Sequence, residues 1–141
     1  MTRAQVISNP ARVWAFVNAI EPIFLQSGMK GLGWEVDGEL VAGVIYDGYT
    51  GHNIWMHIAA KSGATHWLNR TALRAAFDYP FVQLQLPRVS GWVETSNARA
   101  IRFDEHLGFR REALLKGAGR KGEDVILYVM TNQECRYVKI P

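Results

Sequence analysis

Two ionisable side chains in this sequence stand on segments that could hold a reactive group in place. His57 falls within an apolar run of strand length, and its imidazole could act as a general base or a proton shuttle near neutral pH. Glu94 ends a second strand-like segment and could accept a proton as a carboxylate. Both groups indicate proton transfer, although His57 could instead bond a neighbouring strand and Glu94 could be an exposed strand end.

Covalent and metal chemistry are not indicated by the remaining candidates. Cys135, the single cysteine, follows the last predicted strand and has no adjacent base, so we do not assign it as a nucleophile. One cysteine excludes an intramolecular disulfide, which suits a reducing compartment. Cys135 and the 4 scattered histidines cannot form a zinc site unless carboxylates contribute.

Length and charge limit the class of protein. The 141 residues fit one domain spanning residues 1–141. The net charge of +3 would help to attract an anionic ligand, but no long Lys/Arg stripe indicates nucleic-acid binding. No run approaches about 18 apolar residues, and the first residues lack the apolar segment of a signal peptide. We therefore expect a cytoplasmic protein with no nucleic-acid or membrane partner.

Apolar periodicity and turn residues predict an α+β chain with a mixed sheet. Asp37-Gly38 is a preferred pair for a tight hairpin turn, and Gly108 is typical of a helix end. Residues 24–33 are rich in glycine and are predicted as a loop or a short second helix. A crossover within residues 53–94 should place two parallel strands near the centre. The predicted strands are 4–7, a hairpin over 34–46, 53–60, 88–94, 109–115 and 124–130, and the predicted helices are 10–20, 66–79 and 98–107.

The segment from Asn97 to Phe109 resembles the signature of the GNAT superfamily of N-acetyltransferases. In that signature an Asn opens a helix, a small residue follows three positions later, and the helix ends in Glu-Lys-Leu-Gly-Phe or a similar run. Arg102 matches a basic residue of the ribosomal-protein-alanine acetyltransferase-like branch. The resemblance covers residues 53–130 well and the earlier residues only by element order. The matching residues are Asn97, Ala100, Glu105, Leu107, Gly108 and Phe109.

This resemblance implies a GNAT-like single domain, with a mixed sheet of six to seven strands, a splayed parallel pair and three to four helices. It also implies acetyl-CoA as the acyl-donor cosubstrate. The pantetheine arm would lie between residues 55–60 and 88–94, and the diphosphate would rest on backbone amides of residues 61–65. The cofactor-binding residues that the resemblance implies are Ile58, Ala59, Ala60, Lys61, Ser62, Gly63, Ala64, Thr65, Asn97, Arg102 and Phe103.

The loop of residues 60–65 departs from the family pattern, and Asn97 and Arg102 each have a second interpretation. The family's phosphate loop reads Gln/Arg-x-x-Gly-x-Gly/Ala, whereas this chain keeps only Gly63, and Lys61 could partly replace the missing charge. Asn97 would bond the CoA arm or brace the splayed strands, or it could be a plain helix N-cap. Arg102 would meet the 3′-phosphate of CoA, or it could lie on a solvated helix face.

The implied reaction is direct attack of a primary amine on acetyl-CoA, which requires a base and an acid. Some family members place a Glu two residues earlier on the same strand face, so Glu94 is the leading base and His57 the second candidate. The Tyr that many members use as the acid is replaced here by Asp104, and an ionised carboxylate is a poor acid. Tyr128 or a water could substitute for it.

Two questions stay open at this stage. The acceptor could be a small amine or a protein N-terminus, and tryptophans exposed in the N-terminal half could form the face of a homodimer. The chain could also be a non-catalytic CoA-binding or structural protein, of phage origin for example, that retains the acetyltransferase fold without transfer. Fold alone does not decide between these functions.

Overall fold

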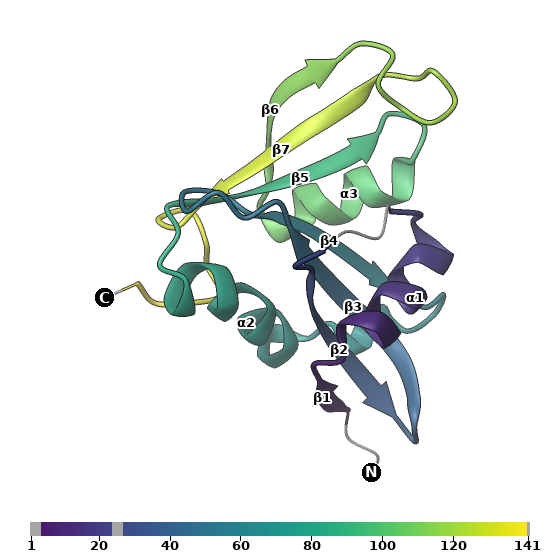
Figure 1. The fold of residues 1–141 in the computed structure, drawn as a ribbon, viewed down its shortest axis with the longest axis vertical. Helices are drawn as coiled ribbons and strands as arrows, with labels where there is room; N and C mark the ends of the chain where they lie inside the picture. The colour runs from purple at the N-terminus through teal and green to yellow at the C-terminus, as the bar shows by residue number, and fades with distance from the viewer. Residues whose placement is uncertain (1–3, 24–26, 141) are drawn as a thin grey trace.

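The computed structural model describes residues 4–23 and 27–140, which form one mixed sheet with helices packed on it (Figure 1). Within this part of the chain, seven strands follow the order β1-β2-β3-β4-β5-β7-β6, with three α-helices between them. The predicted α+β architecture is therefore confirmed, and the parallel pair β4 and β5 lies at the centre. The elements are β1 (Gln5–Ile7), α1 (Pro10–Ile20), β2 (Lys30–Val36), β3 (Glu39–Asp47), β4 (Trp55–Ala60), α2 (Arg70–Asp78), β5 (Arg88–Glu94), α3 (Ala98–Leu107), β6 (Arg110–Leu115) and β7 (Val125–Thr131).

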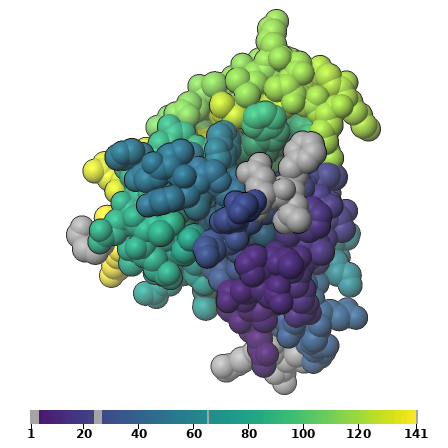
Figure 2. Space-filling view, viewed as in Figure 1, coloured from purple at the N-terminus to yellow at the C-terminus, as the bar shows by residue number. Residues whose placement is uncertain are grey.

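Helix α1 covers one face of strands β2 to β4. Val13 and Val17 are fully buried there, in a small cluster with Ile45 of β3 and Ala59 of β4. In the space-filling view α1 forms the purple surface of this half, whereas the yellow-green β6–β7 hairpin forms the opposite end (Figure 2). Since Asn9 caps α1 and Pro10 follows it, the helix begins where the sequence predicted.

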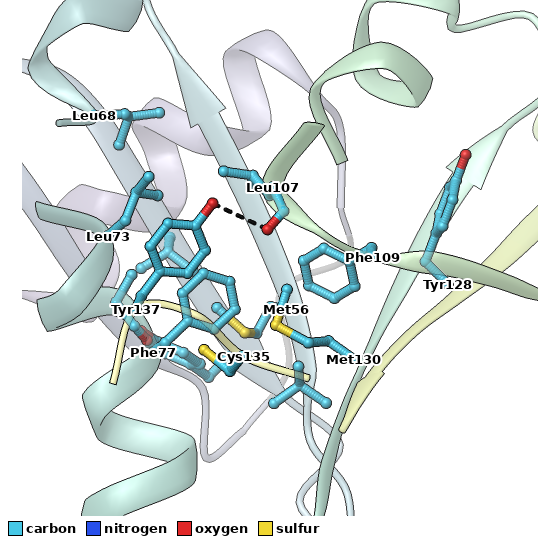
Figure 3. Packing of buried hydrophobic residues seen from close by; sticks show 14 of the residues in the cluster. Met56, Leu68, Leu73, Phe77, Leu107, Phe109, Tyr128, Met130, Cys135 and Tyr137 are labelled. Atoms are coloured by element: carbon cyan, nitrogen blue, oxygen red, sulfur yellow. Dashed lines mark hydrogen bonds between the residues drawn. The ribbon is translucent and has the colours of Figure 1, made fainter. Parts of the chain in front are cut away.

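Helices α2 and α3 pack on the other face of the sheet, over the larger core. Phe77 of α2 stacks on Tyr137 with ring centroids 5.1 Å apart. The Tyr137 hydroxyl donates to the carbonyl of Leu107 at 2.9 Å, so the segment after β7 ties α2 to the end of α3 (Figure 3). Gly108 then ends α3 in the left-handed region, at φ 112°, as its position after the predicted helix indicated.

The tryptophans of the N-terminal half are not exposed. Trp34 is buried in the larger core, and Trp14 is half-buried and donates its Nε1–H to the carbonyl of Ile23 at 3.2 Å. The expectation that tryptophans of this half are free to form a homodimer face is therefore wrong. Within residues 4–23 and 27–140, no helix has the length and apolar character needed to cross a membrane.

Strand β2 replaces part of the glycine-rich loop that the sequence predicted over residues 24–33. The strand begins at Lys30 and runs through Gly31 and Gly33, while residues 24–26 lie outside the described part. A Cβ at Gly31 or at Gly33 would lie 3.1 Å from Val13 of α1. These glycines therefore permit a close approach between the sheet and α1 rather than a turn, which the sequence does not distinguish.

The helix predicted over 66–79 is shorter and begins later. A 3₁₀ turn, η1 (Thr65–Trp67), comes first, and α2 starts only after Asn69, whose side chain accepts from the amide of Ala72 at 3.0 Å. At its end, Pro80 does not stop the chain at once but sits in a π-helical turn, η2 (Tyr79–Gln83). Leu84 donates to the carbonyl of Tyr79 at 3.0 Å, a wider turn that spans the proline, which has no N–H to donate.

Strands β4 and β5 meet at one end and diverge towards the other (Figure 1). Their only registered pair in the described chain is Trp55 with Ser90, where the Ser90 amide donates to the carbonyl of Ile54 at 2.9 Å. On the other sides, β4 pairs with β3 along its full length, and β5 pairs with β7 along its full length. The sheet is therefore split between its two central strands, as the splayed pair of the predicted fold requires.

A buried polar cluster holds the closed end of this split. The Ser90 hydroxyl donates to the Asn53 side-chain oxygen at 2.6 Å and accepts from the Arg88 guanidinium at 3.0 Å. Arg88 also donates to Asn53 at 3.1 Å and forms an ion pair with Glu112 at 2.7 Å. Ser90 is only 4% exposed, so its partners cannot be replaced by bulk water without rearrangement.

Ser90→Ala should destabilise the fold, because it removes two hydrogen bonds from a buried place and leaves Asn53 and Arg88 bonded only to each other and to Glu112. We expect the free energy of unfolding to fall by about 1–3 kcal/mol, measured by urea titration. Arg110→Ala is the control, since its ion pair with Glu134 at 2.7 Å is exposed and its loss should leave the free energy of unfolding nearly unchanged. Equal losses in the two variants would contradict the role of the cluster.

Candidate active site

Two cavities adjoin the split between β4 and β5. The first has a volume of about 260 Å³ and is lined by Ile20, Glu21, Ile58, Ala59, Ala60, Asn97, Arg99, Ala100 and Phe103. The second, of about 510 Å³, is lined by Ile20, Glu21, Pro22, Ile23, Asp47, Gly48, Trp55, His57, Trp92, Val93, Glu94, Asn97, Ala118 and Arg120. Three residues, Ile20, Glu21 and Asn97, line both, so the cavities adjoin at this point.

Asn97 makes two bonds at the junction of the cavities. Its side-chain oxygen accepts from the amide of Ala100 at 3.1 Å, which is the N-cap of α3. Its side-chain nitrogen donates to Glu21 Oε1 at 3.1 Å. Because Glu21 caps the end of α1, one side chain joins two helices on opposite faces of the sheet across the split. The cap and the brace considered for Asn97 are thus both present.

Glu21 is a site residue that the sequence analysis treated only as a helix end. Burial raises the pKa of Glu21 above its usual range, while the hydrogen bond from Asn97 and the charge of His57 oppose that rise. The sequence did contain a signal for it. A carboxylate at the C-terminus of a helix opposes the helix dipole, and such a local conflict is typical of functional positions.

The second cavity brings together the two bases that the sequence indicated. His57 Nε2 lies 3.3 Å from Asp47 Oδ1, and Glu94 Oε1 accepts from Arg120 Nε at 2.9 Å. His57 projects from β4, and Glu94 from β5. The side chain of Glu94 is 17% exposed, so it faces the cavity rather than standing free as a strand end. Residues from both diverging strands therefore line one wall.

Asp104 has the titration behaviour that a proton donor needs. Burial, followed by the nearby charges of Glu21 and Glu105, raises the pKa of Asp104 to about 7. The carboxyl lies against β5, since a Cβ added at Gly91 would be 3.5 Å from Asp104 Oδ2. From the sequence, a carboxylate here is expected to be a poor acid unless its pKa is strongly shifted, and the burial and neighbouring charge that shift it come from tertiary structure.

Tyr128, the acid suggested in its place, lies elsewhere. Its hydroxyl donates to Glu105 Oε2 at 2.7 Å, and Glu105 also accepts from Arg111 at 2.8 Å. Burial and the bond to Glu105 raise the pKa of Tyr128 to about 12, so it holds its proton at neutral pH. The hydroxyl points away from the core residues around Phe109, and Tyr128 lines neither cavity (Figure 3).

The residues expected to bind the cofactor divide between two places. Ile58, Ala59, Ala60, Asn97 and Phe103 line the first cavity. Lys61 and Ser62 line a neighbouring groove, where Lys61 Nζ lies 3.8 Å from the carboxylate of Glu39. The structure thus brings the end of β4 and the start of α3 together, and Lys61 and Ser62 lie in the groove beside them.

The remaining expected cofactor residues lie outside these linings. Gly63 adopts φ 78°, which favours glycine, and the amide of Ala64 donates to the carbonyl of Lys61 at 2.8 Å. The side chain of Thr65 is not among the described ones. Arg102 is exposed and lines neither cavity, whereas Arg99 of the same helix lines the first. Arg99 is therefore a second cation candidate that the family pattern did not indicate.

Comparisons with known proteins define the fold. No protein-family model and no curated protein sequence matches the chain. Among solved structures it is similar to spermidine/spermine N-acetyltransferase SpeG from Vibrio cholerae in complex with manganese ions, at 16% identity and TM-score 0.70, covering 93% of this chain and 94% of that one. To the structure of two mutant forms of the same enzyme, the sequence identity is 15% and the TM-score 0.72, and the match covers 93% of this chain and 96% of that one. To a SpeG chimera from Vibrio cholerae and hSSAT, the sequence identity is 15% and the TM-score 0.73, and the match covers 97% of this chain and 99% of that one.

These likenesses show that the chain has the fold of the GNAT acetyltransferases. They cover nearly the whole of each chain, so the likeness is not confined to one part of the fold. The identities are too low to carry more than the fold. The ribosomal-protein-alanine branch, to which Arg102 pointed, stays a prediction.

Asp104→Asn should change how stability depends on pH. The pKa of about 7 in the folded state exceeds the ordinary Asp value, so the folded wild type holds an extra proton and loses stability as pH rises towards 7. The side-chain amide of the Asn that replaces Asp104 does not titrate in this pH range. We therefore expect the unfolding free energy of the variant, relative to wild type, to increase by about 1–3 kcal/mol between about pH 4 and about pH 7.

Urea unfolding at a series of pH values measures this difference. Asp78→Asn, on α2 and away from both cavities, serves as the control, and its difference from wild type should not follow the same curve. Curves for Asp104→Asn and wild type that stay parallel over the whole range would remove Asp104 as a shifted acid.

Proposed function

We propose that this chain is an acetyl-CoA-dependent N-acetyltransferase that transfers an acetyl group to a primary amine by direct attack. The observation that carries the proposal is the split between β4 and β5, which opens onto two adjoining cavities of different character. Apolar side chains make up most of the lining of the first cavity, with Glu21 and Arg99 as its charged residues, whereas the second is lined by more ionisable side chains and by two tryptophans. A thioester could enter from one side and an amine from the other, and they would meet near Asn97 and Glu21.

The first cavity suits the pantetheine arm of acetyl-CoA. β4 contributes Ile58, Ala59 and Ala60 to its wall, beyond the one point at which β4 and β5 pair. An extended arm with amide groups could bond strand backbone there, as an added strand does. Backbone amides near Gly63 and the guanidinium of Arg99 would then bind phosphate oxygens, with Arg102 as the alternative cation.

The second cavity supplies groups for the proton transfers. The neutral amine attacks the thioester carbonyl carbon, the C–N bond forms and the C–S bond breaks. The nitrogen loses its proton to a base, for which Glu94 is the leading residue and His57 the second. The departing thiolate takes a proton from an acid. Neither Asp104 nor Tyr128 lines either cavity, so each would reach the thiolate through a water; of the two, Asp104 is better suited, because an acid whose pKa lies near the working pH transfers its proton readily.

The acceptor class is supported only in general terms by the comparisons. The similar SpeG structures are spermidine N-acetyltransferases, and spermidine carries primary amines. A small amine and a protein N-terminus both present the nucleophile that the second cavity would receive. The volume of about 510 Å³ favours a small molecule, since such sites commonly measure about 300–1,000 Å³.

A non-catalytic CoA-binding or structural role is the second candidate. It is favoured by the phosphate loop, in which Lys61 faces Glu39 rather than the first cavity and α2 begins only at Arg70. The helix-start amides that would bind a diphosphate are therefore displaced from the strand end. Binding of acetyl-CoA without transfer to any amine would support this role.

Acetyl-CoA should raise the thermal stability of the chain and release free thiol when a primary amine is added. Ligand at about 100 times its dissociation constant stabilises the folded state by about 2.7 kcal/mol, which a thermal shift detects. Glu94→Gln should lower turnover at neutral pH while the thermal shift with acetyl-CoA stays as in wild type. The absence of any shift at millimolar acetyl-CoA would end the enzyme proposal, and an unchanged rate–pH curve in Glu94→Gln would remove Glu94 as the base.

Asn97→Ser should separate the cap of α3 from the brace to Glu21. Serine caps helices well but has no amide nitrogen to reach Glu21, so stability should stay within about 0.5 kcal/mol while acetyl-CoA affinity falls about tenfold. Asn97→Ala, which removes the cap as well as the brace, should also lower the free energy of unfolding by about 1 kcal/mol. Asn69→Ser is the matched control, since Asn69 caps α2 through the same contact at 3.0 Å. Wild-type affinity in Asn97→Ser would contradict the brace.

A further inference from the structure

The second cavity contains two tryptophans that the proposed reaction does not use. Trp55 of β4 and Trp92 of β5 meet edge to face, with ring centroids 6.4 Å apart and an interplanar angle of 70°. They stand at the closed end of the split, and Trp92 is 38% exposed although it is a large apolar side chain. Gly48 presses on the Trp55 ring, since a Cβ there would lie 2.6 Å from Trp55 Cδ1. The indole of Trp55 is thus held in place, and Trp92 offers free aromatic surface beside it.

The polar groups of this cavity, by contrast, already have partners in the protein. Asp47 lies 3.3 Å from His57, Glu94 pairs with Arg120 at 2.9 Å, and Glu21 accepts from Asn97 at 3.1 Å. The binding capacity left for a ligand is therefore mainly aromatic. A flat ring is the ligand part that indole surfaces bind best, since aromatic pairs contribute about 0.5–1.5 kcal/mol beyond the area they bury.

The charges of the lining indicate the other end of the ligand. Three carboxylates, those of Glu21, Asp47 and Glu94, stand against the guanidinium of Arg120 and the imidazole of His57, so acidic groups outnumber basic ones. This excess of negative charge attracts an ammonium group rather than a carboxylate. Glu21 is the carboxylate at the junction with the first cavity, so a cation held there would lie where the two cavities adjoin.

We propose that the second cavity takes a small arylalkylamine, with its ring on Trp92 and Trp55 and its ammonium near Glu21. This inference rests on the proposed function, for which it names the acceptor class. Acetylation would replace the ammonium by a neutral amide, so the product would lose its attraction to the carboxylates while its ring contacts stay the same. A linear polyamine, which has no ring to stack, would use little of the aromatic surface.

Thiol release from acetyl-CoA with a set of amines tests the acceptor class. We expect kcat/KM for 2-phenylethylamine to exceed that for n-butylamine, spermidine and an alanyl peptide by about tenfold, the effect of one good aromatic contact. Trp92→Ala should raise KM for 2-phenylethylamine about tenfold with kcat nearly unchanged, as expected for lost uniform binding, and Trp92→Phe should largely restore it. Tyr49→Ala is the control, since Tyr49 is an exposed aromatic, 59% accessible, that does not line the cavity.

The outcomes separate this inference from the function beneath it. Thiol release that is fastest with spermidine or the peptide, and unaffected by Trp92→Ala, would overturn the arylalkylamine while leaving the transferase in place. If no amine releases thiol, calorimetry with 2-phenylethylamine still decides: binding that Trp92→Ala abolishes and Tyr49→Ala retains supports the site, and no binding overturns it. The acetyl-CoA thermal shift then reports on the proposed function independently.

Discussion

The single backbone contact between β4 and β5 is the constraint on which the rest of the structure depends. The amide of Ser90 bonds the carbonyl of Ile54, and beyond that point each strand is paired only on its outer side. An open sheet edge inside a protein leaves backbone groups that need partners. The buried cluster around Ser90 holds the strands together where they meet, so they can diverge elsewhere without separating. The cavities follow from this arrangement, because a fully paired sheet would leave no opening between its faces.

The open end of the split is bridged by side chains rather than by backbone. Asn97 joins the start of α3 to the end of α1 through Glu21, and these helices lie on opposite faces of the sheet. The same bridge marks the point where the two cavities adjoin. The charge of Glu21 also helps to raise the pKa of Asp104. The groups proposed for chemistry therefore share one electrostatic environment, in which burial favours the protonated carboxyl. A change at Glu21 should reach Asp104 through charge, with no movement of the backbone.

Much of the fold could be predicted from local sequence because its elements obey local rules. Pro10 follows a capping Asn9, Asn97 caps α3 and Gly108 ends it, so α1 and α3 have their predicted bounds. The predicted hairpin over 34–46 includes the end of β2, but the first residues of that strand, 30–33, could not be predicted, since their glycines are explained by the approach of α1, a contact distant in sequence. The candidate site was predicted in part for a similar reason. Residue types and a family pattern indicate Glu94, but the shifted carboxyl of Asp104 depends on burial that appears only in the folded chain.

The proposed function requires that an acyl-CoA binds in the split between the central strands. A crystal structure of the chain with bound acetyl-CoA addresses this directly. We expect the pantetheine arm between β4 and β5, its amides within hydrogen-bonding distance of the backbone near Ile58 and Ala60, and its thioester carbonyl beside Asn97. Acetyl-CoA bound on another surface, or strands β4 and β5 paired along their whole length in the crystal, would contradict the account.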